Sequence, residues 1–83
     1  MVPVQSRMAR AATGLQLLDV AALAKVATTT IVRFEKGVEL KPRTVEAIQR
    51  AYESAGIEFL DGEAPGVRFH APSASTRQRG RGK

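Results

Sequence analysis

Residues 17–37, LLDVAALAKVATTTIVRFEKG, decide the fold because they hold two short segments with helical apolar spacing. In the first segment Val20, Leu23 and Ala24 fall on one face of a helix. Ala21 is small enough to let a second helix approach closely. We therefore expect a helix over residues 17–25 whose inner face carries these side chains.

The second segment predicts a helix over residues 28–36, with Ile31 and Phe34 on its inner face. Gly37 is expected to end it in the left-handed conformation. Two helices joined by so short a turn must cross steeply, as in helix-turn-helix units, which place their second helix in a DNA groove.

Residues 12–37, ATGLQLLDVAALAKVATTTIVRFEKG, resemble the start of the Cro/C1-type (XRE) helix-turn-helix regulators of bacteria and phages. The resemblance continues through residues 40–59, LKPRTVEAIQRAYESAGIEF. It implies a mainly α, four-helix domain. The chain departs from the family pattern in having Gln16 and Leu17 for the usual Ser/Thr and Gln, Lys25 for the turn glycine, and Ala27 for the Ser/Thr cap.

If the chain binds DNA, the outward side chains of the helix over residues 28–36 and the residues that follow it are expected to contact the DNA. Its candidate base-reading residues are Thr28, Thr29, Val32 and Arg33, because hydroxyls bond base edges, methyl groups contact thymine and arginine pairs with guanine. The alternative role for the threonines is local capping, with Thr28 taking over from Ala27 as the helix cap. The family's phosphate clamp implies phosphate contacts from the backbone N–H groups of Gly37 and Val38. It also implies contacts from the side chains of Lys36, Lys41 and Arg43. The family also implies a structural ion pair between Arg10 and Glu35.

The rest of the chain predicts further helices over residues 3–13 and 42–55 and a β-hairpin over 57–70. Residues 71–83, APSASTRQRGRGK, predict a disordered basic tail beyond a single domain, 1–70. Tyr52 is expected in the core with its hydroxyl at the surface. The first helix is expected to turn inward an apolar stripe formed by Val4, Met8, Ala11 and Ala12.

Composition restricts the function further. The chain of 83 residues has no cysteine, a single histidine and no catalytic constellation, so we expect no enzyme, metal or cofactor. No apolar run approaches the roughly 20 residues of a membrane span, and no signal peptide is evident, which predicts a cytoplasmic protein without a membrane partner. Of the net charge of +5, the tail contributes four. In the rest of the chain, basic residues predominate up to residue 43 and acidic residues predominate from 44 to 70.

Two functions from different classes remain open. The first is a small bacterial transcriptional regulator that binds double-stranded DNA, as a homodimer because one module with few reading side chains would bind weakly. The second is an antiactivator, which uses a helix-turn-helix-like fold to bind and inhibit a transcriptional activator protein such as a quorum-sensing regulator. Leu17 and Leu18 favour the second, since two adjacent leucines cannot both face one core and form a candidate protein-partner patch.

Overall fold

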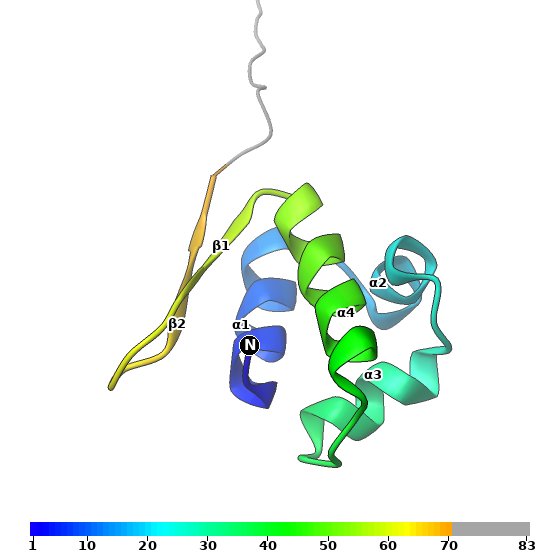
Figure 1. Cartoon of the computed structure of the whole chain (residues 1–83). Coiled ribbons are helices and arrows are strands. Elements are labelled where there is room, and N and C mark those ends of the chain that lie inside the picture. Colours follow the sequence, from blue (N-terminus) through cyan, green and yellow to red (C-terminus); the bar gives the residue numbers. More distant parts are fainter. Residues whose placement is uncertain (71–83) are drawn as a thin grey trace, which may run out of the picture.

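The computed structural model describes residues 1–70, which form four helices followed by a β-hairpin (Figure 1). The elements are α1 (Pro3–Thr13), α2 (Leu17–Ala24), α3 (Thr28–Glu35), α4 (Pro42–Ser54), β1 (Ile57–Leu60) and β2 (Gly66–Phe69). The mainly helical fold with a C-terminal hairpin is confirmed, and α2, α3 and α4 each end one residue earlier than predicted. The predicted disorder of residues 71–83 lies outside the described residues.

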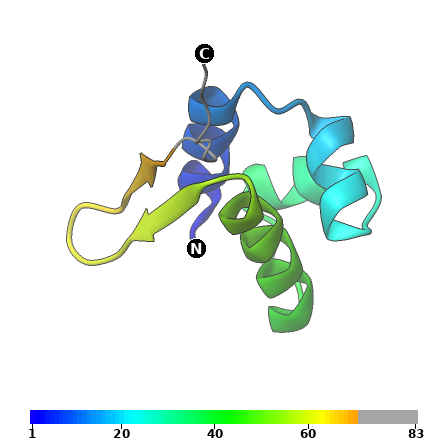
Figure 2. The same cartoon turned by 90° about the horizontal axis from the view of Figure 1, so that it is seen from above.

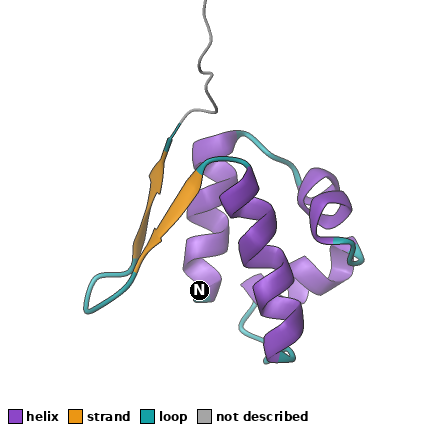
Figure 3. Ribbon diagram, turned by 45° about the horizontal axis from the view of Figure 1, so that its top comes forward, coloured by secondary structure: helices purple, strands orange, loops and turns teal. Residues whose placement is uncertain are grey.

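The helix α4 packs mainly against α2 and also contacts β1, while α3 contacts both α1 and α2 (Figures 1 and 2). The hairpin packs against α1 on the side away from α2, and β1 also contacts α4 (Figure 3). Its strands pair antiparallel, from Ile57 opposite Phe69 to Leu60 opposite Gly66. An isolated hairpin is marginally stable, so this packing on the helices is what holds it.

The apolar core forms where the four helices and β1 meet, with Ala9 of α1 fully buried in it. Its largest buried apolar side chains are those of Ile31, Phe34, Ile48, Tyr52 and Ile57. Small residues of α2 bring the other helices close to this core. The prediction that Leu23 faces inward is wrong, because Leu23 is 51% exposed and Ala21 takes the inner face instead.

The prediction for the inner face of α1 is also wrong. Val4, Ala11 and Ala12 are exposed and Met8 is only half-buried, whereas the buried side chains of α1 are Gln5, Ser6 and Ala9. Burying two polar side chains is costly unless each finds hydrogen-bond partners. Both do so, and these partners explain the orientation of α1.

The buried amide of Gln5 joins α1 to the hairpin. Its Nε2 donates to the carbonyl oxygens of Leu60 and Gly66, each at 2.9 Å. Its Oε1 accepts the backbone N–H of Val2 at 2.8 Å, which also satisfies a free donor at the start of α1. Leu60 and Gly66 are the last paired residues before the hairpin loop, so Gln5 fixes the loop end of the hairpin on α1.

A chain of buried polar groups joins three helices. Ser6 Oγ of α1 donates to Glu35 Oε2 of α3 at 2.6 Å and lies 2.8 Å from the hydroxyl of Tyr52 of α4. Because Ser6 has one hydroxyl proton, the Tyr52 hydroxyl must donate to Ser6. The prediction that this hydroxyl reaches the surface is therefore wrong, since Tyr52 is fully buried.

The predicted pair of Arg10 and Glu35 is present and two-pronged. Arg10 Nη2 lies 2.6 Å from Glu35 Oε1 and Arg10 Nε lies 2.9 Å from Oε2, while Arg7 Nη2 donates to the Glu35 carbonyl oxygen. Burial alone would raise the pKa of Glu35, but hydrogen bonds from Arg10 and Ser6 and the nearby positive charges outweigh it, so that pKa lies below its usual 4.5. Burial raises the pKa of Tyr52.

The turn between α2 and α3 contains a strained residue. Lys25 ends α2 with φ 60° and ψ 45°, and its N–H bonds the carbonyl oxygen of Ala21. This left-handed conformation is unfavourable for a side chain with a Cβ atom and favours glycine. Tertiary packing of α2 and α3 therefore holds Lys25 in this conformation.

Removing either partner of the Arg10–Glu35 pair should destabilise the fold unequally. Arg10→Ala leaves the Glu35 carboxylate, which is only 7% exposed, without its two hydrogen bonds from Arg10. This variant should lower the free energy of unfolding by about 2–4 kcal/mol. Glu35→Gln should cost less, because Arg10 can reach water. Denaturant titration at pH 7 measures both, and equal costs would contradict this account.

The lowered pKa of Glu35 also predicts a pH dependence. A carboxyl whose pKa is lower in the folded state stabilises it fully above its unfolded value of 4.5, and this contribution is lost as the pH falls through the folded pKa. The unfolding free energy should therefore fall on acidification below about pH 4.5, and this fall should be smaller in Glu35→Gln. Denaturant titrations from pH 7 to pH 3 test it, with the exposed Glu53→Gln as the matched control.

Lys25→Gly should stabilise the chain by about 0.5–1 kcal/mol, because it removes the Cβ strain at a positive φ while adding some entropy to the unfolded chain. Lys25→Ala removes the same charge but keeps the Cβ atom and should give no such gain. Thermal unfolding of the two variants separates strain from charge, and equal melting temperatures would refute the strain argument.

Candidate nucleic-acid interface

The outward side of α3 is formed as predicted. Ile31 and Phe34 are buried on its inner side. Thr29 and Arg33 are exposed, and Thr28 and Val32 are half-buried beside them. The candidate base-reading residues thus share one accessible surface on a helix that the core holds from behind.

The start of α3 leaves its threonine side chains free. The N-cap residue is Ala27, and it makes no side-chain cap, so the alternative in which Thr28 caps the helix is wrong. The first backbone bond runs from the N–H of Thr30 to the carbonyl oxygen of Ala27 at 3.0 Å. Within residues 1–70 the hydroxyls of Thr28 and Thr29 make no hydrogen bond, so both are available to an outside acceptor or donor.

The end of α3 corrects part of the predicted phosphate clamp. Gly37 has φ 94°, as expected for a left-handed C′ residue, and its N–H bonds the carbonyl oxygen of Phe34 at 2.9 Å. The N–H of Val38 bonds the carbonyl oxygen of Arg33 at 3.0 Å, which completes a Schellman motif. Both N–H groups are therefore already used inside the protein and do not point free toward a phosphate.

Four cations surround this surface without internal partners. Arg33, Lys36, Lys41 and Arg43 are exposed, and none of them forms an ion pair with another of residues 1–70. A hollow of about 500 Å³ at the start of α4 is lined by residues 41–44, including Lys41 and Arg43. By contrast, Arg7, Arg10 and Arg68 each lie against a glutamate. The side chains of Lys36, Lys41 and Arg43 thus remain candidates for phosphate contact.

The leucine patch at the start of α2 is divided between core and surface. Leu17 is half-buried and packs against the core, whereas Leu18 is 72% exposed. The expectation that at least one of the two is exposed is confirmed. The weak cap Gln16 is compensated by Asp19, whose Oδ2 accepts the Gln16 N–H at 2.9 Å.

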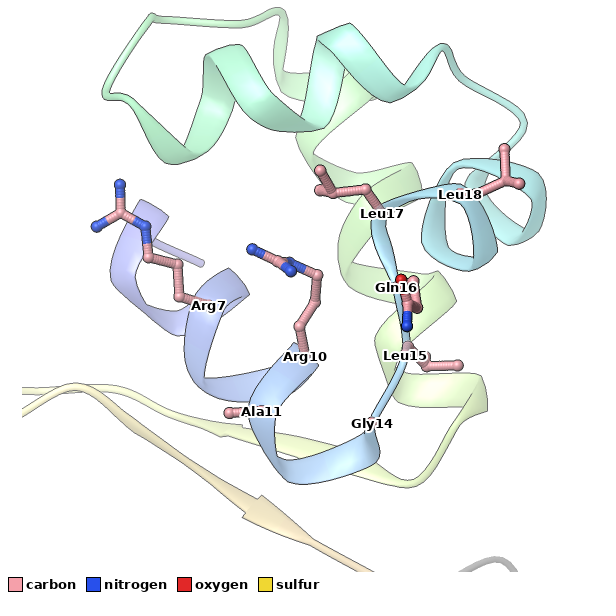
Figure 4. Close-up of a pocket in the computed structure, with 8 residues that line it drawn as sticks. All are labelled: Arg7, Arg10, Ala11, Gly14, Leu15, Gln16, Leu17 and Leu18. Carbon is pink, nitrogen blue, oxygen red and sulfur yellow. The ribbon is translucent and has the colours of Figure 1, made fainter.

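A groove of about 520 Å³ opens between α1 and the start of α2 (Figure 4). Arg7 and Arg10 extend from α1, while Leu15, Leu17 and Leu18 belong to the connection and α2 (Figure 4). The residues that line it all lie between positions 7 and 18, so it shares no side chain with the surface of α3.

The sequence analysis named Leu17 and Leu18 on one side of this groove, but it assigned no contact to Arg7 on the other side. No signal in a single sequence links Arg7 to the carbonyl of Glu35, because the contact spans a distance of 28 positions.

The described residues offer no evident metal centre. No group of three or more His, Asp or Glu side chains gathers in residues 1–70 to hold an ion. His70 Nε2 lies 2.9 Å from Glu58 Oε1 on the exposed face of the hairpin, and Arg68 lies beside the same carboxylate. The hydrogen bond from His70 and the nearby charge of Arg68 lower the pKa of Glu58, whose side chain is exposed. None of the helices between residues 1 and 70 has the length and apolar character that crossing a membrane requires.

Comparisons with known proteins add no family to this geometry. No family model matches the chain, and a search of curated proteins gives no match either. The resemblance of residues 12–59 to the Cro/C1-type regulators therefore stays a prediction, and the function is inferred from the surface of α3 and its surroundings.

Proposed function

We propose that this chain is a small bacterial transcriptional regulator of the helix-turn-helix type that binds double-stranded DNA with α3 in the major groove. The observation that carries the proposal is the outward side of α3, where Arg33 and two threonine hydroxyls have no partner within residues 1–70. Ile31 and Phe34 hold this helix against the core from the opposite side.

The reading chemistry assigned to α3 is modest. Arg33 pairs with guanine O6 and N7, Thr28 and Thr29 bond base edges, and Val32 contacts a thymine methyl group. With a single arginine and no Asn or Gln, this set should discriminate weakly between bases. Binding therefore depends strongly on phosphate contacts, which we assign to the side chains of Lys36, Lys41 and Arg43.

A homodimer fits this mechanism better than a monomer. One module with so few reading side chains binds weakly, and two copies double the contacts on half-sites about 34 Å apart, one turn of DNA. Occupation of such a pair of half-sites in a promoter then excludes or recruits polymerase.

One observation favours the second candidate, an antiactivator that binds a transcriptional activator protein. The exposed side of α2 carries Leu18 and Leu23, exposed by 72% and 51%, and neither contributes to DNA readout. The Schellman motif also occupies the N–H groups of Gly37 and Val38, which leaves fewer backbone donors for phosphate. A protein that inhibits an activator needs an apolar surface of this kind.

DNA binding by α3 predicts two distinct mutational effects. Arg33→Ala should lose about 1–3 kcal/mol of discrimination at one base pair. Lys41→Ala and Arg43→Ala should instead weaken binding evenly across sequences and lower the slope of log K against log[salt] by about one each. Fluorescence anisotropy on duplexes selected from a random 20-base-pair pool measures these effects at several salt concentrations.

The matched controls are Arg68→Ala, which removes an exposed cation from the hairpin, and a full chain whose Arg77, Arg79, Arg81 and Lys83 are replaced by serine. Neither should change which duplexes are selected. If all binding disappears with the four serines and no sequence is enriched, the chain holds DNA through its tail charge alone, and the antiactivator function is favoured.

A further inference from the structure

We propose that two copies of this chain associate through the outer edge of β2, so that their hairpins form one four-stranded antiparallel sheet. The inference names the interface of the homodimer, and it rests on the proposed DNA-binding function only for the need of a second copy. Its evidence comes from the hairpin and α1, which share no residue with the candidate DNA-reading surface of α3.

The outer edge of β2 carries backbone groups that are left without partners in residues 1–70. The N–H of His70 bonds the carbonyl oxygen of Gly56 at 2.7 Å, so these two opposite residues form a hydrogen-bonded pair. Because such pairs alternate with non-hydrogen-bonded pairs in an antiparallel ladder, the N–H and C=O groups of Val67 and Phe69 point away from β1. Neither residue forms a hydrogen bond to any other part of residues 1–70. Such an open edge is a template for pairing with another strand.

The helix α1 exposes apolar side chains on the side to which this edge opens. It contacts mainly β2, whereas α4 contacts β1, so the outer edge of β2 lies away from α4. Starting from Gln5, which bonds the hairpin, a rotation of about 100° per residue places Ser6 toward α4 and Val4 on the opposite side. Val4 is 43% exposed, and Ala11 is exposed on the same side of the helix. Because residues opposite each other share a face of a sheet, a second hairpin paired at this edge brings its own α1 toward these side chains.

The sequence of β2 favours one register for two identical strands. With Val67 opposite Val67 of the second copy, Phe69 lies opposite Pro65, and about four hydrogen bonds form because a proline carbonyl accepts although its nitrogen cannot donate. Arg68 then lies opposite Gly66. A register with Phe69 opposite Val67 would instead set the two Arg68 side chains directly against each other, which is destabilising.

Charge also favours the antiparallel arrangement of the two hairpins. The loop of each hairpin, residues 61–65, contains Asp61 and Glu63 and no cation, whereas Arg68 lies toward the other end of the hairpin. Pairing about a two-fold axis brings the acidic loop of one copy beside the end of the other that carries Arg68, and it keeps the two acidic loops apart. The surface is therefore complementary to a second copy of itself.

Hydrogen exchange of single amides tests the edge directly. The full chain is followed by sedimentation equilibrium and by NMR exchange over a range of protein concentrations. We expect a monomer–dimer equilibrium in which the N–H groups of Val67 and Phe69 exchange about tenfold or more slowly at high concentration. The N–H of Phe59, which faces the outer edge of β1, is the control and should change less than about twofold. A chain that stays monomeric at millimolar concentration, or that dimerises without slowing the two β2 amides, would overturn the inference.

Variants of β2 separate backbone pairing from side-chain packing. Val67→Pro removes an N–H that the hairpin itself does not use and should weaken the dimer about tenfold or more. Val67→Ala also shortens the side chain but keeps the N–H, and it should weaken the dimer less than about threefold. Equal effects of the two substitutions would contradict strand pairing. Thermal unfolding of dilute samples checks that both variants are folded.

Variants of α1 test the apolar side chains and do not depend on the folding of Val67→Pro. Val4→Glu brings two carboxylates together in the dimer and should weaken it about tenfold, while the fold is kept because an acidic residue is favourable in the first turn of a helix. Leu23→Glu makes the same change at an exposed side chain of α2 and should alter the dimer less than about twofold. If Leu23→Glu abolishes the dimer and Val4→Glu does not, the interface lies on α2 and the inference is wrong.

The outcomes also separate this inference from the proposed function. A chain that selects duplexes through Arg33 but stays monomeric would overturn the β2 interface alone. A chain that dimerises through β2 but selects no duplex would support the interface and contradict DNA readout by α3.

Discussion

The buried carboxylate of Glu35 is the constraint on which the position of α3 depends. A carboxylate that is 7% exposed is stable only when donors replace its lost water, and here α1 provides them through Arg10 and Ser6. Because Ser6 also accepts the hydroxyl proton of Tyr52, the same network reaches α4. A shift of α3 relative to α1 would leave this charge without donors. The network therefore fixes where the end of α3 lies.

This constraint matters because α3 has little stability of its own. It is eight residues long, and its N-cap makes no side-chain hydrogen bond. Helices shorter than about 12–15 residues are marginal in water unless packing supports them. Ile31 and Phe34 supply apolar packing, which is not strongly directional, whereas the fork between Arg10 and Glu35 has a defined geometry. The outward direction of Arg33 thus follows from a polar contact on the opposite side of the helix.

The sequence was sufficient for the elements but not for every face. Helical spacing and Gly37 predicted the ends of α2 and α3 to within one residue, because the spacing of apolar residues and the conformation of a glycine are local properties. The inner face of α1 was misassigned because Gln5 and Ser6 look like surface residues. Their burial depends on acceptors far along the chain, the carbonyl of Leu60 and the carboxylate of Glu35. At the site, the exposure of Thr29 and Arg33 could be predicted from the helical period. That the N–H of Gly37 bonds the carbonyl oxygen of Phe34 could be seen only in the folded backbone.

The apolar residues that α1 and α2 leave exposed have the same origin as these errors. Because polar side chains of α1 occupy the interior, its apolar stripe at Val4 and Ala11 is displaced to the surface. Ala11 and Leu18 both line the groove, but they lie at opposite ends of it (Figure 4). Apolar side chains left in water do not stabilise the isolated chain. Buried polar side chains such as Gln5 and Ser6 are also not expected to stabilise the core more than apolar ones would. The groove and the Glu35 network are physically joined, because Arg7 and Arg10 line the groove and also donate hydrogen bonds to Glu35. A contact that drew either arginine away from Glu35 would therefore also weaken the hold on α3.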